Sequence, residues 1–74
     1  MYTLYDFMNK FKFEDFAICS NTNKNEMLTS RKINHKDLDD AMNFDTPEQK
    51  ALYDYMEHAV VSVDFTTNTI YIED

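Results

Sequence analysis

Residues 60–73, with the sequence VVSVDFTTNTIYIE, decide the fold of this chain. Apolar and polar residues alternate over 61–66 and again over 69–73, which is the period of a strand with one buried face. Threonines and an asparagine separate the two runs, and such residues are typical of a turn. The stretch therefore predicts a β-hairpin against which the rest of the chain packs.

The register of this hairpin follows from keeping its large aliphatic side chains on one face. A turn with an odd number of residues would place half of them in water, so we expect two or four. The pairs are then Phe65 with Ile70 and Val63 with Ile72. Since the chain contains no glycine, Asn68 is the residue best suited to a positive φ. We expect the four-residue loop 66–69, because the shorter turn would put a threonine in that strained region.

Length and composition set broad limits on the class of protein. The 74 residues are enough for one small domain, spanning 1–74, with a thin core. No run approaches the roughly 20 apolar residues that span a membrane, and no charged start followed by an apolar segment indicates secretion. Cys19 is the single cysteine and cannot form an intramolecular disulfide. These features favour a reducing cytoplasm.

Charge is unevenly distributed along the chain. The net charge is −7. Residues 1–36 hold four acids against six bases, which gives +2, whereas residues 37–74 hold ten acids against Lys50 alone, which gives −9. The acidic half should repel nucleic acid and attract basic surfaces. A solvated face that prevents aggregation explains the same charge, and both interpretations stay open.

Capping residues indicate the starts of three helices. Thr3 precedes a first helix, in which apolar residues recur at helical spacing from Leu4 to Phe11. Asn34 has Asp37 in the capping-box position of a second, short helix. The clearest start is at Thr46, which is followed by proline at the first helical position and by glutamine at the third.

Two further strands complete the expected fold. Residues 16–20 and 26–30 flank the asparagine-rich turn 21–25 and predict a first hairpin. The predicted order is α-β-β-α-α-β-β, a small α+β domain with an antiparallel sheet and helices packed on one face.

The sequence carries no pattern that predicts catalysis or cofactor binding. His35 and His58 stand outside any metal-ligand spacing, and Cys19 lies in the middle of a predicted strand. Asp39 and Asp40 are adjacent, so on a helix they diverge by about 100° and are poorly placed for acid–base work. We expect neither an enzyme nor a cofactor or metal. The scattered bases of the first half also argue against direct binding of nucleic acid.

The overall arrangement resembles a family of small phage proteins. A helix over 3–11, a strand, an asparagine-rich turn, acidic helices and a closing hairpin make the chain similar to anti-CRISPR proteins. The resemblance implies a phage-encoded inhibitor acting in the cytoplasm of a bacterial host. Such inhibitors bind a host defence effector, here a CRISPR effector, and mimic DNA by placing acidic side chains in its basic nucleic-acid-binding groove.

The candidate partner-binding residues are the carboxylates of the two later helices and one tyrosine that could anchor a contact. They are Asp37, Asp39, Asp40, Asp45, Glu48, Tyr53, Asp54 and Glu57.

The alternative belongs to another class, a small phage structural or assembly protein that homodimerises. It would do so through 69–73 as an edge strand, or through a face of exposed tyrosines such as Tyr53 and Tyr71. The sequence is compatible with a monomer or a homodimer.

Overall fold

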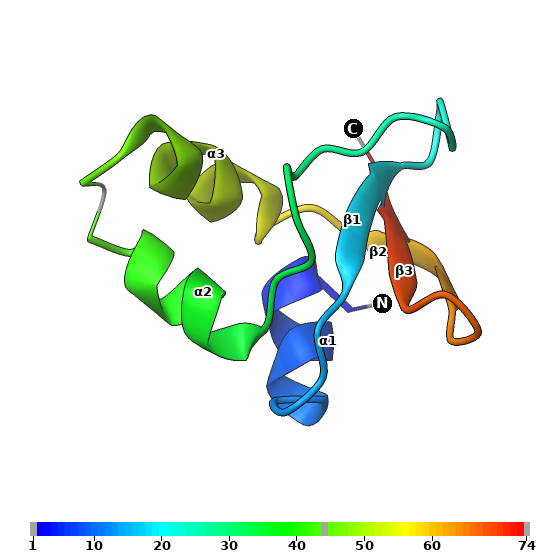
Figure 1. Ribbon diagram of the computed structural model, residues 1–74, viewed down its shortest axis with the longest axis horizontal. Helices are drawn as coiled ribbons and strands as arrows, with labels where there is room; N and C mark the ends of the chain where they lie inside the picture. Colours follow the sequence, from blue (N-terminus) through cyan, green and yellow to red (C-terminus); the bar gives the residue numbers. More distant parts are fainter. Residues whose placement is uncertain (1, 44, 74) are drawn as a thin grey trace.

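The computed structural model describes residues 2–43 and 45–73, and over these residues it contains three helices and three strands (Figure 1). In chain order they are α1 (Leu4–Lys10), β1 (Ala17–Ser20), α2 (His35–Ala41), α3 (Pro47–Tyr55), β2 (Val60–Asp64) and β3 (Thr69–Ile72). The α+β class is confirmed, but the order is α-β-α-α-β-β. None of the helices in the described ranges has the length and apolar character needed to cross a membrane.

The strand predicted over 26–30 does not form. Met27 pairs with Cys19 in a single antiparallel bridge, and the Leu28 amide donates to the carbonyl of Ile18 at 2.8 Å. Beyond this point the Thr29 hydroxyl donates to the carbonyl of Arg31 at 2.8 Å, a local bond that competes with a strand ladder. The segment therefore covers the outer edge of β1 as a loop.

The sheet is mixed, so the prediction of an antiparallel sheet is wrong. Its strand order is β1-β3-β2, with β1 parallel to β3 and β2 antiparallel to β3. The chain leaves β1 and passes through α2 and α3 before it returns, and such a crossover permits parallel pairing. Because β3 is the central strand, residues 69–73 cannot provide a sheet edge for a dimer.

The closing hairpin forms with a register two residues away from the expected one. Val63 lies opposite Ile70 and Asp64 opposite Thr69, so the four-residue turn is 65–68. The Asp64 carboxylate accepts the amide of Thr66 at 2.9 Å and starts the turn early. A two-residue shift preserves the alternation of faces, so Ile70 and Ile72 are buried as expected.

Two residues of the hairpin nevertheless leave the predicted face. An irregularity between Val60 and Ser62 sets Val60 opposite Ile72, and Val61 is 47% exposed. Phe65 lies in the turn and is 56% exposed. Asn68 adopts φ 50°, which confirms the prediction of a positive φ.

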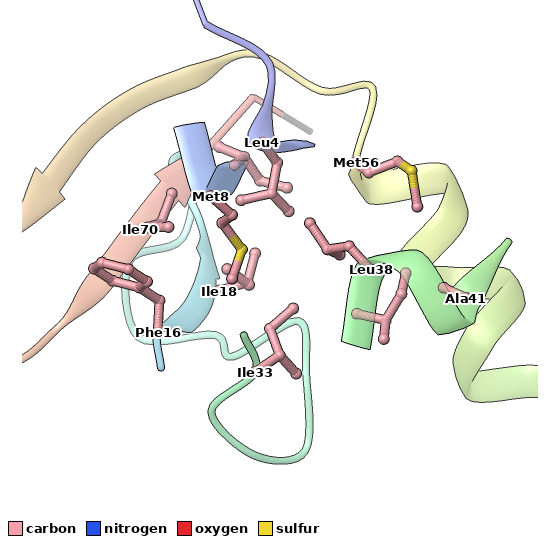
Figure 2. Close-up of a cluster of buried hydrophobic side chains, with 11 residues drawn as sticks. Leu4, Met8, Phe16, Ile18, Ile33, Leu38, Ala41, Met56 and Ile70 are labelled. Carbon is pink, nitrogen blue, oxygen red and sulfur yellow. The ribbon is translucent and has the colours of Figure 1, made fainter. Parts of the chain in front are cut away.

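The core lies between the sheet and the helices (Figure 2). Leu4 and Met8 of α1 point toward Ile18 and Ile70 of the sheet, and all four side chains are fully buried. Side chains from α2 and α3 extend this cluster; they are Leu38, Ala41 and Leu52. Backbone hydrogen bonds join the start of α1 to the segment that follows α3. The Leu4 amide donates to the carbonyl of His58 at 2.9 Å, and the Tyr5 amide donates to the carbonyl of Met56 at 3.1 Å.

Candidate partner-binding surface

The eight predicted residues lie on α2, on α3 and on the segments beside them. Asp37, Asp39 and Asp40 belong to α2, and Glu48, Tyr53 and Asp54 belong to α3. Asp45 precedes α3 and Glu57 follows it. The two helices pack against each other, and the eight residues have different surroundings.

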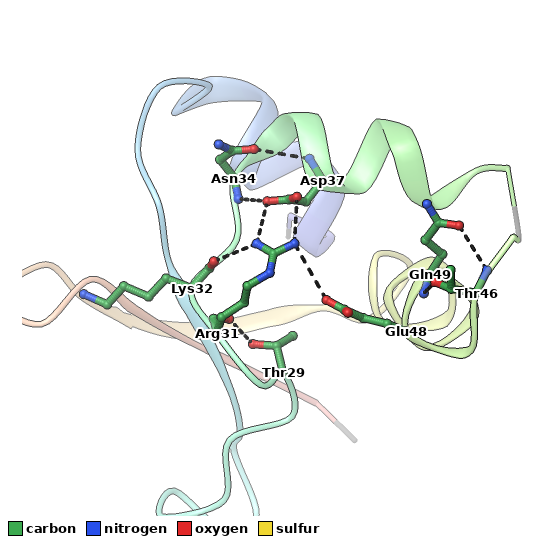
Figure 3. Close-up of polar contacts among 8 residues, drawn as sticks. All are labelled: Thr29, Arg31, Lys32, Asn34, Asp37, Thr46, Glu48 and Gln49. Atoms are coloured by element: carbon green, nitrogen blue, oxygen red, sulfur yellow. Dashed lines mark hydrogen bonds and ion pairs between the residues drawn. The ribbon is translucent and has the colours of Figure 1, made fainter.

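Asp37 is committed to contacts within the protein (Figure 3). Its carboxylate accepts the backbone amide of Asn34 at 2.9 Å and closes a reciprocal capping box at the start of α2. It also accepts two bonds from the Arg31 guanidinium, at 3.0 and 3.3 Å. Partial burial opposes its ionisation, but the bonds from Arg31 and Asn34 and the charge of Arg31 outweigh burial and lower the pKa of Asp37. This carboxylate therefore stabilises the helix start.

Arg31 also connects α2 to α3. Its Nη2 atom lies 3.7 Å from Oε1 of Glu48, whose side chain remains 53% exposed. The guanidinium sits at a cleft of about 280 Å³ that is lined by three of the predicted residues, Asp37, Asp40 and Glu48. Arg31 was not among the predicted site residues, because its spacing of six from Asp37 matches no helical pattern. Only the fold brings the two together.

Asp39 faces the opposite way, toward α1. Its carboxylate accepts the hydroxyl of Tyr5 at 3.0 Å and lies 3.2 Å from Nδ1 of His35. The hydrogen bond to Asp39 is the main cause of a raised pKa for Tyr5, with smaller effects of burial and of nearby negative charge. His35 Nε2 is buried and has no hydrogen-bond partner among the described residues. Asp39 thus joins α2 to α1.

Asp39 is exposed but is engaged by Tyr5 and His35. The other five exposed carboxylates of this region we call the acidic surface. They are Asp40, Asp45, Glu48, Asp54 and Glu57. The Asp54 side chain is 77% exposed, and its carboxylate lies 3.8 Å from Nε2 of His58. Tyr53 is half-buried and packs against the core, so it contributes only part of its ring to this surface.

The remaining reactive groups are dispersed. Within residues 2–43 and 45–73, no three His, Cys, Asp or Glu side chains are grouped to hold a metal ion. Cys19 is buried, and burial raises the pKa of its thiol. A buried neutral thiol is a weak nucleophile.

No protein-family model matches this chain, and no curated protein or solved structure is significantly similar to it. Its function is therefore inferred from its own residues.

Proposed function

We propose that this chain is an inhibitory binding protein of the anti-CRISPR type. It binds a host defence effector, occupies the basic groove that would hold nucleic acid, and blocks access of DNA. The partner is thus a protein with a basic surface, and the chain itself contacts no nucleic acid.

The observation that carries this proposal is the acidic surface on α2, α3 and their flanking segments. Over residues 35–57 the sequence has seven acids and only two lysines. Six of the seven carboxylates are exposed, and one of the six, Asp39, accepts a hydrogen bond from Tyr5. Carboxylates held on packed helices can pair with arginine and lysine side chains that otherwise bind phosphates. Such a surface accelerates encounter with a basic groove and loses strength as salt rises.

Asp37 and Asp39 support this surface without belonging to it. Arg31 holds Asp37 and lies 3.7 Å from Glu48, while Tyr5 holds Asp39. These contacts fix α2 relative to its neighbours. A fixed arrangement of charges loses less entropy on binding than one on mobile segments, which favours affinity.

Paired charge reversals test the proposal. The variant Asp40→Lys/Asp54→Lys changes the acidic surface, and Asp6→Lys/Glu26→Lys changes the net charge equally at exposed acids outside it. Binding of each immobilised variant to a panel of purified CRISPR effectors is measured against increasing sodium chloride and against free DNA. We expect wild type and the second variant to capture an effector in competition with DNA, and the first variant to lose capture.

Two results would reject the proposal. Effector binding by Asp40→Lys/Asp54→Lys that equals the wild-type affinity would show that the acidic surface is not used. Equal loss in both variants would show that only bulk charge matters.

A homodimer remains the alternative proposal, but its sheet contact would be through β2 and not through residues 69–73. Strand β3 is paired on both sides, and β2 forms an edge with the exposed Val61. The expected face of tyrosines is weakly developed, because Tyr53 and Tyr71 are half-buried and Tyr2 carries Lys10 over its ring.

A further inference from the structure

The side chain of His58 lies between the end of α3 and the end of β3. Its Nδ1 atom is hydrogen-bonded to the backbone carbonyl of Glu73, and its Nε2 atom lies 3.8 Å from Oδ2 of Asp54. The ring also meets the ring of Tyr55 edge-on, with the two centroids 6.0 Å apart. The imidazole is 29% exposed. Groups from two elements therefore hold it, while protons can still reach it from solvent.

Backbone hydrogen bonds fix the surroundings of this ring. The His58 amide donates to the carbonyl of Tyr55 at 3.0 Å, and the Glu73 amide donates to the carbonyl of Ala59 at 3.0 Å. The carbonyl that faces Nδ1 thus belongs to a residue whose backbone is paired with the residue next to His58. The fold itself therefore sets the geometry around the imidazole.

The two polar contacts of the imidazole require more than one proton. A carbonyl oxygen only accepts hydrogen bonds, so Nδ1 carries the hydrogen. In the neutral ring Nε2 is then an acceptor, and it faces the carboxylate of Asp54, which is also an acceptor. A proton on Nε2 makes both nitrogens donors and turns the contact with Asp54 into an ion pair. Both contacts are therefore satisfied only in the cationic form of His58.

The charges around the imidazole also favour its cation. Beside Asp54 on α3, the carboxylates of Glu57 and Glu73 line an open cleft of about 380 Å³ together with His58, and neither lysine nor arginine lines it in the part of the chain that the structure describes. From α1 the nearest contact is the backbone amide of Leu4, which carries no formal charge. The ring also follows the carboxyl end of α3, where the helix dipole favours positive charge.

We propose that His58 is a pH-sensitive link between α3 and the end of β3, closed when the imidazole is protonated. An imidazole gains its proton between about pH 8 and pH 5, and the cation then joins Asp54 to the carbonyl of Glu73. A proton that the folded chain binds more tightly than the unfolded chain stabilises the fold toward the acidic end of this range, and this stabilisation is lost as pH rises. The same proton offsets part of the charge of the acidic surface, to which Asp54 and Glu57 belong.

Urea denaturation at pH 8 and at pH 6 tests this link. The variant His58→Gln removes the titrating group, and Asp54→Asn removes the carboxylate beside it. Asp40→Asn is the matched control, because it removes one negative charge at an exposed position on α2. The second histidine, His35, is present in every variant, so its contribution cancels. From pH 8 to pH 6 we expect the folded-to-unfolded ratio of the wild type to gain about twofold to fivefold over that of His58→Gln. Asp54→Asn should lose part of this gain, and Asp40→Asn should keep it.

Two outcomes would overturn the proposal. Parallel stability changes in the wild type and in His58→Gln between the two pH values would show that the proton on His58 does not stabilise the fold. Equal losses of the gain in Asp54→Asn and in Asp40→Asn would show that general charge, and not the pairing with Asp54, is responsible. No effector is present in these measurements, so either outcome leaves the proposed use of the acidic surface unaffected.

Discussion

At the scale of single residues, neighbours outside the helix decide whether a carboxylate is structural or available. Asp37 and Asp40 are three positions apart on α2, yet Arg31 occupies the first while the second is exposed. Asp39, between them, is held by Tyr5 from another helix. The aspartates of α2 therefore differ in role, although their side chains are chemically identical.

The pH dependence of Asp37 is the prediction that belongs to this scale. Asp37→Asn should lower the free energy of unfolding by about 1 kcal/mol at pH 7, because it weakens the capping box and removes the partner of Arg31. The folded pKa of Asp37 is lowered, so its contribution is present above the unfolded value of about 3.9 and is lost as pH falls through the folded value. The difference between variant and wild type should therefore shrink on acidification.

Urea denaturation from pH 7 to pH 3 measures this difference, with Asp40→Asn as the control at an exposed position. A midpoint for Asp37→Asn that equals that of the control at pH 7 would contradict the prediction. So would a difference that stays constant on acidification.

At the scale of elements, capping sets where each helix begins. The Thr46 hydroxyl accepts the Gln49 amide at 3.1 Å, and Gln49 Oε1 in turn accepts the amide of Thr46 at 3.2 Å. Pro47 occupies the first turn, where a missing amide is harmless. Since α3 carries Leu52 into the core, the start of this helix also positions a core side chain.

Removing this cap should destabilise the whole domain. We expect Thr46→Ala to lower the free energy of unfolding by about 1 kcal/mol. In the Thr46→Ala background, Gln49→Ala should lower the free energy of unfolding by less than it does in the wild type, because the two hydrogen bonds depend on each other. Urea midpoints of the single and double variants check this against Lys50→Ala, an exposed change on the same helix. Thr46→Ala that unfolds at the same urea concentration as this control would refute the role of the cap.

At the scale of the whole molecule, charge opposes compactness. The net charge of −7 is confined to a fold with a radius of gyration of 11.0 Å. At low ionic strength, about 0.01 M, the screening length is about 30 Å, so every carboxylate repels the others. One hydrophobic cluster, with residues from all three helices and the sheet, has to balance this repulsion.

Salt should therefore stabilise the fold. We expect the urea midpoint to rise between about 0.01 and 0.15 M sodium chloride, because screening weakens self-repulsion. The variant Asp40→Lys/Asp54→Lys carries two changes of +2 each, which takes the net charge from −7 to −3. The urea midpoint of this variant should rise less with salt than that of the wild type. A midpoint that falls as salt is added would mean that ion pairs such as Arg31–Asp37 outweigh the repulsion.

The sequence by itself determined the features that depend on near neighbours. The caps Asn34 and Thr46 and the positive φ of Asn68 were predicted and are confirmed, because each depends on bonds or sterics within about four residues. The placement of the acidic residues on two helices follows from the same local rules.

Only the tertiary structure decided the pairing of distant segments. The parallel pairing of β1 with β3 and the contact of Tyr5 with Asp39 join residues far apart in sequence. Local propensity is silent on such contacts, because their free energy depends on which surfaces are buried together. For the same reason the sequence located the carboxylates, whereas the packing of α1, α2 and α3 determined which of them remain open to a partner.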